Sequence, residues 1–387
     1  MKVVHVSDCF LPRLGGIEIQ LAELTRMEKA AGHEVEVITA TPDRGDIGRD
    51  NRANSGIPVH RVVAPLPFEL PVHPRMGHHL AALFRRLRPD VVHVHVGAIS
   101  PFGWAGVRQA ALQGIPTVVT VHSLWDPATC ALYRLLDATV GWTRWPGVCT
   151  TVSEAAAAPI RRVVESRVPV HVVANGIATE QWRGSPSVAA GDRPEDVHVV
   201  AVGRLAPRKQ PLTLLAILRT AQRTLAERGE DVRLRATIVG DGPARPLMER
   251  YLRRYAMADW VELTGRLDRR QVRTVLEDAD IFLAPARRES FGLAALEARM
   301  TGVPVVACAE SGVADFVVPE KEGLLGRSPA GLAAAVVRLA GDAALRSALA
   351  EHNRETEPVH CTWPVVLAHF EERYAQAVVR ALGVPVR

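Results

Sequence analysis

The chain has 387 residues, of which 48% are hydrophobic and 23% are charged, and its formal net charge is +5. This length exceeds one ordinary domain and suits two domains of about 180 residues each. The mild positive charge fits an anionic substrate but lacks the strong basic bias of nucleic-acid-binding proteins, so no nucleic-acid partner is predicted.

The first half of the chain alternates short β-branched runs with helical patterns, which is typical of a parallel sheet built from β-α units. The expected strands are 2–7, 34–40, 57–63, 91–96, 116–121, 148–152 and 170–174. No signal-peptide pattern and no run of 18 apolar residues is found, and the five cysteines form no C-x-x-C pair. We therefore predict a cytoplasmic protein without a disulfide framework.

A glycine pair, Gly15 and Gly16, follows the first expected strand and precedes a helical pattern from Gln20 to Ala31. Glycines let a loop approach a ligand closely, and a helix N-terminus attracts anions. The dinucleotide fingerprint Gly-x-Gly-x-x-Gly is absent. On spacing alone, a structural turn is an equal alternative to a ligand contact.

Residues 78–88 form an amphipathic, basic helical pattern. Such a helix either rests on anionic lipid or buries one face in the protein and solvates the other. Peripheral contact with the inner face of the membrane therefore stays open as an alternative.

Histidines gather at one edge of the predicted first sheet. His93 and His95 share one face of a strand, and His122 ends the next strand. No carboxylate or cysteine completes a recognisable zinc-ligand spacing, so no metal site is predicted. We expect His93 to pack inside the protein and His95 to face an acceptor substrate.

Aromatic residues are frequent in the segment 124–147, where they either line an acceptor pocket or pack a core. Trp125 and Asp126, which follow His122 closely, are the further acceptor-binding candidates of this segment.

Residues 183–195 read as a linker, because they are polar and contain glycine, serine and proline. The β-α pattern then restarts, with expected strands at 197–203, 232–240, 260–265, 280–285 and 303–307. The predicted fold class is therefore α/β, with two Rossmann-like doubly wound domains facing each other across a cleft. The domains are 1–185 and 196–362, followed by a helical segment 363–387. Ligands are expected at the carboxyl ends of the strands.

Two cations, Arg204 and Lys209, follow the strand 197–203. They can neutralise the roughly two negative charges of a diphosphate. The alternative is that both side chains are merely solvated, as Lys and Arg on loops usually are.

Two carboxylates, Glu289 and Glu297, are separated by seven residues between two apolar strands. Ser290 is the predicted N-cap of a helix from Phe291 to Met300, whose first amides attract phosphate. The carboxylates can accept hydrogen bonds from sugar hydroxyls on either side of that phosphate. A sugar nucleotide fits this description.

The motif Glu-Ser-Phe-Gly-Leu-x3-Glu-Ala, followed by Gly-Val-Pro-Val-Val-Ala, resembles the donor-site signature of retaining glycosyltransferases of family 4 (glycosyl transferases group 1), which have the GT-B fold. The resemblance runs in order along nearly the whole chain, through Gly-Gly-x-Glu, the strand ending in His122, and Gly-Arg-Leu-x3-Lys.

This resemblance implies a role for each matching residue. Arg204 and Lys209 would bind the diphosphate, Glu289 the donor sugar, Glu297 the ribose, and His122 would lie by the reacting sugar. The remaining donor-binding positions are Gly15, Gly16, Arg266, Leu267, Ser290, Phe291, Gly292 and Leu293. The final helix would cross back to the first domain.

By the same resemblance, the expected activity is transfer of a sugar from a UDP- or GDP-linked donor to a hydroxyl, with retention of configuration. The acceptor class stays open between a sugar, a cyclitol, a lipid and a natural product. The sequence Asp278-Ala-Asp280 is formally a metal-binding D-x-D, but it is expected to end a helix, so no obligatory metal or other cofactor is predicted. A sugar-nucleotide 2-epimerase and a catalytically silent sugar-nucleotide-binding protein are the alternatives.

Overall fold

The computed structural model describes residues 1–13, 15–43, 56–64, 73–145, 147–183 and 196–383. The chain divides into two compact units, one of residues 1–176 with 360–387 and one of residues 177–359. The expected linker 183–195 lies, except for Arg183, outside the described residues.

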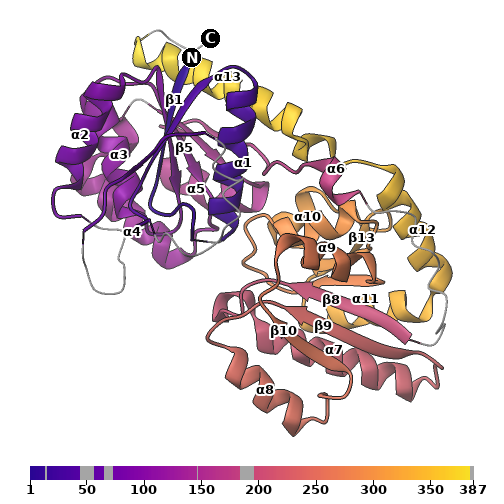
Figure 1. Cartoon of the computed structure of the whole chain (residues 1–387). Helices are drawn as coiled ribbons and strands as arrows, with labels where there is room; N and C mark the ends of the chain where they lie inside the picture. Colours follow the sequence, from indigo (N-terminus) through magenta and orange to yellow (C-terminus); the bar gives the residue numbers. More distant parts are fainter. Residues whose placement is uncertain (14, 44–55, 65–72, 146, 184–195, 384–387) are drawn as a thin grey trace. The chain divides into compact units, whose positions relative to one another are not determined.

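Unit 1 is a parallel sheet covered by helices (Figure 1). Within the described residues, its seven strands lie in the order β3-β2-β1-β4-β5-β6-β7. The strands are β1 Lys2–Ser7, β2 Glu34–Thr39, β3 Val59–Arg61, β4 Val91–Val96, β5 Thr117–Val121, β6 Val148–Thr151 and β7 Val170–Val172. The helices are α1 Gly16–Ala30, α2 Met76–Leu87, α3 Pro101–Leu112, α4 Pro127–Val140, α5 Glu154–Val164 and α13 Trp363–Ala381.

The last helix, α13, packs on unit 1, although it follows the whole of unit 2 in sequence. It contacts β4, β5, β6 and α1. Its inward side chains Trp363, Val366, Phe370 and Tyr374 are all at most 5% exposed. This helix therefore completes one covering layer of the first sheet.

Unit 2 has a second parallel sheet, in the order β10-β9-β8-β11-β12-β13 among its described residues. The strands are β8 Asp196–Val202, β9 Arg233–Val239, β10 Val261–Gly265, β11 Ile281–Ala284, β12 Val305–Cys308 and β13 Gly323–Gly326. The helices are α6 Thr179–Trp182, α7 Pro211–Glu227, α8 Arg245–Arg254, α9 Arg269–Glu277, α10 Leu293–Met300, α11 Pro329–Gly341 and α12 Ala343–Glu355, with short 3-10 turns η4 Pro207–Lys209 and η5 Gly312–Asp315.

In both sheets, the order in which strands are added reverses beside the first strand, between β1 and β4 and between β8 and β11. In doubly wound sheets, this switch point is where loops diverge and ligands bind. The predicted α/β class with two Rossmann-like domains is confirmed. Every predicted strand is present within a few residues, whereas β13 was not predicted.

Candidate functional site

The loop after β8 carries the two predicted diphosphate ligands. Arg204 is exposed to solvent, and the structure records no partner for its side chain among the described residues. Lys209 ends η4, and its Nζ forms an ion pair with Glu289 Oε2. The two side chains are 29% and 17% exposed. Loops that are 80 residues apart in sequence thus bring a cation and a carboxylate of the predicted site into contact.

Backbone hydrogen bonds join the loops that follow β8, β9 and β10. Gly203 N donates to Val239 O at 2.9 Å, and Gly240 N donates to Gly265 O at 2.7 Å. Gly240 has a φ of +133°, and a Cβ there would lie 2.0 Å from Gly203 O. Glycine is therefore required at this position for packing, and the three strand ends form one fixed platform. Arg266 and Leu267 follow directly on β10, with Arg266 exposed.

The carboxylate motif differs from its prediction at the start of its helix. The helix α10 begins at Leu293, and its N-cap is Gly292 with a φ of +95°, so the prediction of Ser290 as N-cap is wrong. A Cβ at Gly292 would also lie 2.6 Å from Val313 Cγ2, which makes glycine the fitting residue in both conformation and space. Phe291 is buried at 2% exposure against Phe316.

The two carboxylates consequently sit on different supports. Glu289 lies in the loop before α10, and its carbonyl accepts a hydrogen bond from Gly312 N at 2.9 Å. Glu297 lies in the second turn of α10 and is partly buried. A main-chain anchor fixes the position of Glu289, whereas the helix fixes that of Glu297.

The formal D-x-D lies at the amino end of β11, not at the carboxyl ends where the donor loops gather. Asp278 is the C-cap of α9, and Asp280 Oδ2 accepts a hydrogen bond from His198 N at 2.8 Å. Arg235 also pairs with Asp278 at 2.8 Å. These partners give both carboxylates a structural role.

In unit 1, α1 begins at Gly16, four residues before the predicted start. Gly15 is its N-cap and Gly16 its first residue, so the glycine pair forms the entry to the helix. Glu18 in the first turn is 5% exposed, and its Oε1 lies 3.3 Å from Arg13 Nε. The N-terminal end of α1, which attracts anions, therefore has the buried carboxylate of Glu18 and the cation of Arg13 beside it.

His122 directly follows β5 and is partly exposed. Its main-chain N donates to Val96 O at 2.9 Å, and its Nε2 lies 3.0 Å from His95 Nδ1. Burial lowers the pKa of His122 to about 4. The imidazole is therefore neutral at physiological pH. Its ring lines a small cavity of about 10 Å³ together with Asn175 and Trp363.

The three acceptor-binding candidates are all engaged by the protein itself. His95 is 2% exposed, so it does not face an acceptor as predicted. Trp125 is 3% exposed and stacks on Tyr133 with ring centroids 4.0 Å apart, so it packs the core instead of lining a pocket. Asp126 is the N-cap of α4 and accepts a hydrogen bond from Thr129 N at 2.7 Å.

Sequence reasoning missed several buried polar residues of unit 1. Asp8 follows β1, accepts hydrogen bonds from Phe102 N and Gly103 N, and so caps α3. Burial raises the pKa of Asp8 to about 6. Glu28 and Tyr374 are each 0% exposed. An acidic residue in the apolar stripe of a helix was the one sequence signal for Glu28.

The amphipathic helix α2 buries its apolar face in the protein. Leu80 and Phe84 are 0% and 1% exposed and belong to the core of unit 1, whereas Arg85 and Arg86 point to solvent. No helix within the described parts of the chain combines the length and the apolar character that crossing a bilayer requires.

Known proteins resemble both units. Residues 14–181 match the family described as Glycosyltransferase Family 4, and residues 196–342 match Glycosyl transferases group 1. A GDP-mannose-dependent alpha-mannosyltransferase of Mycolicibacterium smegmatis is 30% identical over 98% of this chain and 100% of its own length. A phosphatidylinositol N-acetylglucosaminyltransferase subunit of Homo sapiens is 28% identical over 82% of this chain, and this match spans 64% of the human protein.

Among solved structures, Anabaena HepE in complex with UDP and glucose superimposes with a TM-score of 0.76. The match covers 97% of this chain and 100% of that one at 16% identity, so it shows that the two proteins share a fold.

Proposed function

The chain belongs to glycosyltransferase family 4, and from that premise we propose that it moves a sugar from a nucleotide-diphosphate donor to an acceptor hydroxyl with retention of configuration. The observation that carries this proposal is the contact between Lys209 and Glu289 beside Arg204, at the carboxyl end of a doubly wound sheet. It joins a diphosphate-binding charge to a sugar-binding carboxylate.

Charge development explains why cations belong here. When the glycosidic bond breaks, negative charge grows on the departing diphosphate, so Arg204 and Lys209 stabilise the transition state more than the bound donor. In the structure, Lys209 pairs with Glu289. A diphosphate would draw Lys209 away and release the Glu289 carboxylate to accept hydrogen bonds from sugar hydroxyls.

The remaining positions are assigned by family resemblance. Glu297 binds the ribose, and the chain after β10 lies beside the base. The phosphate is held by main-chain groups at the entry to α10. The donor-site set in unit 2 is Arg204, Lys209, Arg266, Leu267, Glu289, Ser290, Phe291, Gly292, Leu293 and Glu297; in unit 1, Gly15 and Gly16 contact the donor phosphate and His122 the transferred sugar.

The proposed reaction uses no metal and no covalent intermediate. The acceptor hydroxyl attacks from the face that the diphosphate leaves, and a donor phosphate oxygen takes the hydroxyl proton. Two cations and a helix N-terminus supply the charge that a metal would otherwise provide.

The donor is proposed to be UDP- or GDP-linked, since a relative is named for GDP-mannose and a solved neighbour holds UDP. The acceptor is a sugar, a cyclitol, a lipid or a natural product.

Turnover of UDP- and GDP-sugars, with and without a panel of such acceptors, tests the proposal. We expect release of nucleoside diphosphate only when a suitable acceptor is present. Isomerised donor without acceptor would instead indicate a 2-epimerase. Donor binding without any turnover across the panel would indicate a silent binding protein.

A further inference from the structure

Four polar side chains form a continuous chain through the interior of unit 1. Glu28 Oε2 lies 2.6 Å from His5 Nε2, His5 Nδ1 lies 3.0 Å from His95 Nε2, and His95 Nδ1 lies 3.0 Å from His122 Nε2. The first three side chains are at most 2% exposed. The hydrogen-bonded chain thus leads from a buried carboxylate on α1 to His122, the one partly exposed residue of the four, directly after β5.

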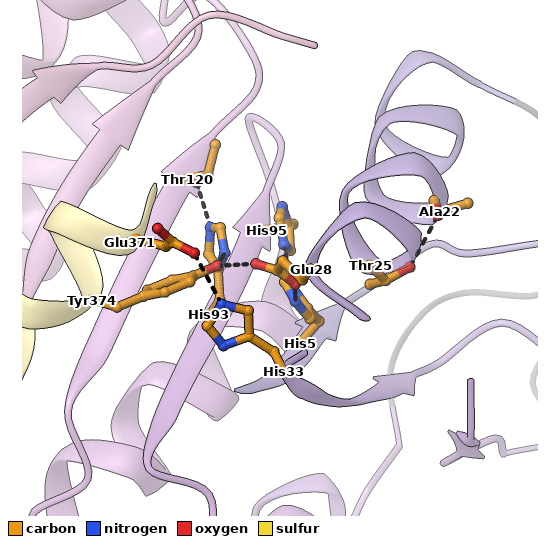
Figure 2. Close-up of polar contacts among 10 residues, drawn as sticks. All are labelled: His5, Ala22, Thr25, Glu28, His33, His93, His95, Thr120, Glu371 and Tyr374. Carbon is orange, nitrogen blue, oxygen red and sulfur yellow. Dashed lines mark hydrogen bonds and ion pairs between the residues drawn. The ribbon is translucent and has the colours of Figure 1, made fainter. Parts of the chain in front are cut away.

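A second branch leaves the same carboxylate, as Figure 2 shows. The Tyr374 hydroxyl donates to Glu28 Oε1, and His93 Nδ1 lies 2.8 Å from that hydroxyl. His93 Nε2 lies 2.6 Å from Thr120 Oγ1. Register places these groups together, because His5 pairs with His93 across β1 and β4, and His95 pairs with Thr120 across β4 and β5.

The carboxylate determines the direction of every hydrogen bond in both branches. Beside an ionised carboxylate, which only accepts, a neutral His5 donates through Nε2, and its Nδ1 is left to accept. His95 therefore donates through Nε2 and accepts through Nδ1, and His122 donates through Nε2. Burial lowers the pKa of His93 and His95 well below the ordinary histidine range, so each ring carries one proton.

The other branch obeys the same logic. The Tyr374 hydroxyl donates its hydrogen bond to Glu28, so its oxygen is left to accept from His93 Nδ1. His93 Nε2 in turn accepts from the Thr120 hydroxyl. All the ring nitrogens of His5, His93 and His95 have hydrogen-bond partners. These three residues also offer ligand atoms within 4.8 Å of one another, which is metal-binding spacing. The complete set of hydrogen bonds favours a metal-free network.

We propose that Glu28 is a positioning residue which, through His5 and His95, keeps the proton of His122 on Nε2 and leaves Nδ1 as a hydrogen-bond acceptor. No partner for His122 Nδ1 is recorded among the described residues. This inference deepens the proposed function, because an acceptor nitrogen at this position would orient a hydroxyl of the transferred sugar.

A buried, ionised carboxylate is costly, and it persists only where its partners stabilise it. Glu28 has two, His5 and Tyr374, from opposite branches. Glu28→Leu removes the acceptor at the end of the His122 branch at similar volume. His5 would then leave its Nε2 unprotonated and donate through Nδ1, because an unsatisfied N–H costs more than an unused lone pair. That change exchanges the donor and acceptor roles of the two His95 ring nitrogens and places the His122 proton on Nδ1.

Histidine labelled with ¹⁵N tests this directly, because pyrrole-like and pyridine-like nitrogens have distinct NMR shifts. Loss of a signal in His122→Asn assigns it. We expect protonated Nε2 and bare Nδ1 in the wild type, and the reverse in Glu28→Leu. Tyr374→Phe is the matched control: it removes a buried hydrogen bond to the same carboxylate and should leave the His122 tautomer unchanged.

Activity supplies the second readout. Glu28→Leu should lower kcat about tenfold, with KM for the donor within about twofold, whereas Tyr374→Phe should keep kcat within about twofold. A wild-type His122 protonated on Nδ1 overturns the proposal even if Glu28→Leu does not fold. One equivalent of zinc in the purified protein also overturns it. Because the NMR measurement of the tautomer needs no substrate, it tests this proposal even if no turnover is found for the proposed function.

Discussion

Unit 1 and unit 2 build similar sheets but place their charged groups in opposite environments. In unit 2, Lys209 and Glu289 meet on loops at the sheet edge, 29% and 17% exposed. In unit 1, Glu28 and His5 meet under a helix with both side chains fully buried. A part-exposed ion pair contributes only about 0–1 kcal/mol to stability, whereas leaving a buried carboxylate without its hydrogen-bond partner costs about 1–3 kcal/mol or more.

This difference separates two kinds of residue. In the proposed function, the charges at the carboxyl ends of the second sheet exchange partners with the donor, so their loss should affect the reaction more than the fold. The buried polar groups of unit 1 are held in one hydrogen-bond arrangement, so their loss should affect both. Each of the following experiments tests this separation.

The largest effect is expected for the diphosphate ligands. Lys209→Ala and Arg204→Ala should each lower kcat by about 10²–10³-fold, because each opposes charge that develops during bond cleavage. The melting temperature should stay within a few degrees of the wild type. Arg208→Ala, a neighbouring exposed cation outside the motif, is the control and should keep near-normal turnover. A near-normal kcat for either ligand variant would show that the diphosphate assignment is wrong.

Acid should destabilise unit 1 before unit 2. Burial lowers the pKa of His122 to about 4, and it holds the pKa values of His93 and His95 well below the ordinary value of 6.5. The stability they confer is therefore complete above about pH 6.5 and is lost as the pH falls towards 4. Asp8, with its pKa raised by burial to about 6, opposes this trend as a single group.

Hydrogen exchange with mass spectrometry, corrected for intrinsic exchange rates, can follow each unit at pH 7.5 and pH 5. In unit 2, burial lowers the pKa of His198 in the same direction. We expect a loss of protection of about 2 kcal/mol or more in the strands of unit 1 and a smaller loss in unit 2. Equal losses of protection in both units would contradict the predicted difference in acid sensitivity between them.

Smaller effects should separate the two motif carboxylates. Glu297→Gln should weaken donor binding about tenfold, because it would remove the proposed charge-assisted hydrogen bond to the ribose. Glu289→Gln should instead lower kcat or change which sugar is transferred. Isothermal titration with UDP and GDP, next to steady-state kinetics, measures both. Identical changes in nucleotide affinity would contradict this division of roles.

Much of the fold could be predicted from sequence, because short β-branched runs that alternate with helical patterns mark the strands of a parallel sheet. β13 escaped prediction, since its sequence Gly323-Leu-Leu-Gly326 begins and ends with a residue that is depleted in strands. Ser290 was the better N-cap by residue type, but the left-handed conformation of Gly292 sets the helix start. Local preference gave way to tertiary packing there.

The candidate sites were predictable to different degrees for the same reason. The donor motif is local, so Glu289 and Glu297 could be proposed as donor ligands from the motif around them and its resemblance to family 4. The histidine network is not local: His93 and Tyr374 are 281 residues apart. Sequence placed His93 and His95 on one face of a strand, and the resemblance placed the final helix on the first domain. Neither showed that Glu28 and Tyr374 would lie against these histidines.

The central claim is sugar transfer with retention, driven by protein cations at the donor diphosphate. Proton NMR of the product formed from an α-linked sugar nucleotide, with EDTA present throughout the reaction, tests it most directly. We predict an α-linked product and undiminished turnover, because in the proposed mechanism Arg204, Lys209 and the entry to α10 supply the charge opposite the leaving group. A β-linked product, or complete loss of activity in EDTA, would contradict this account.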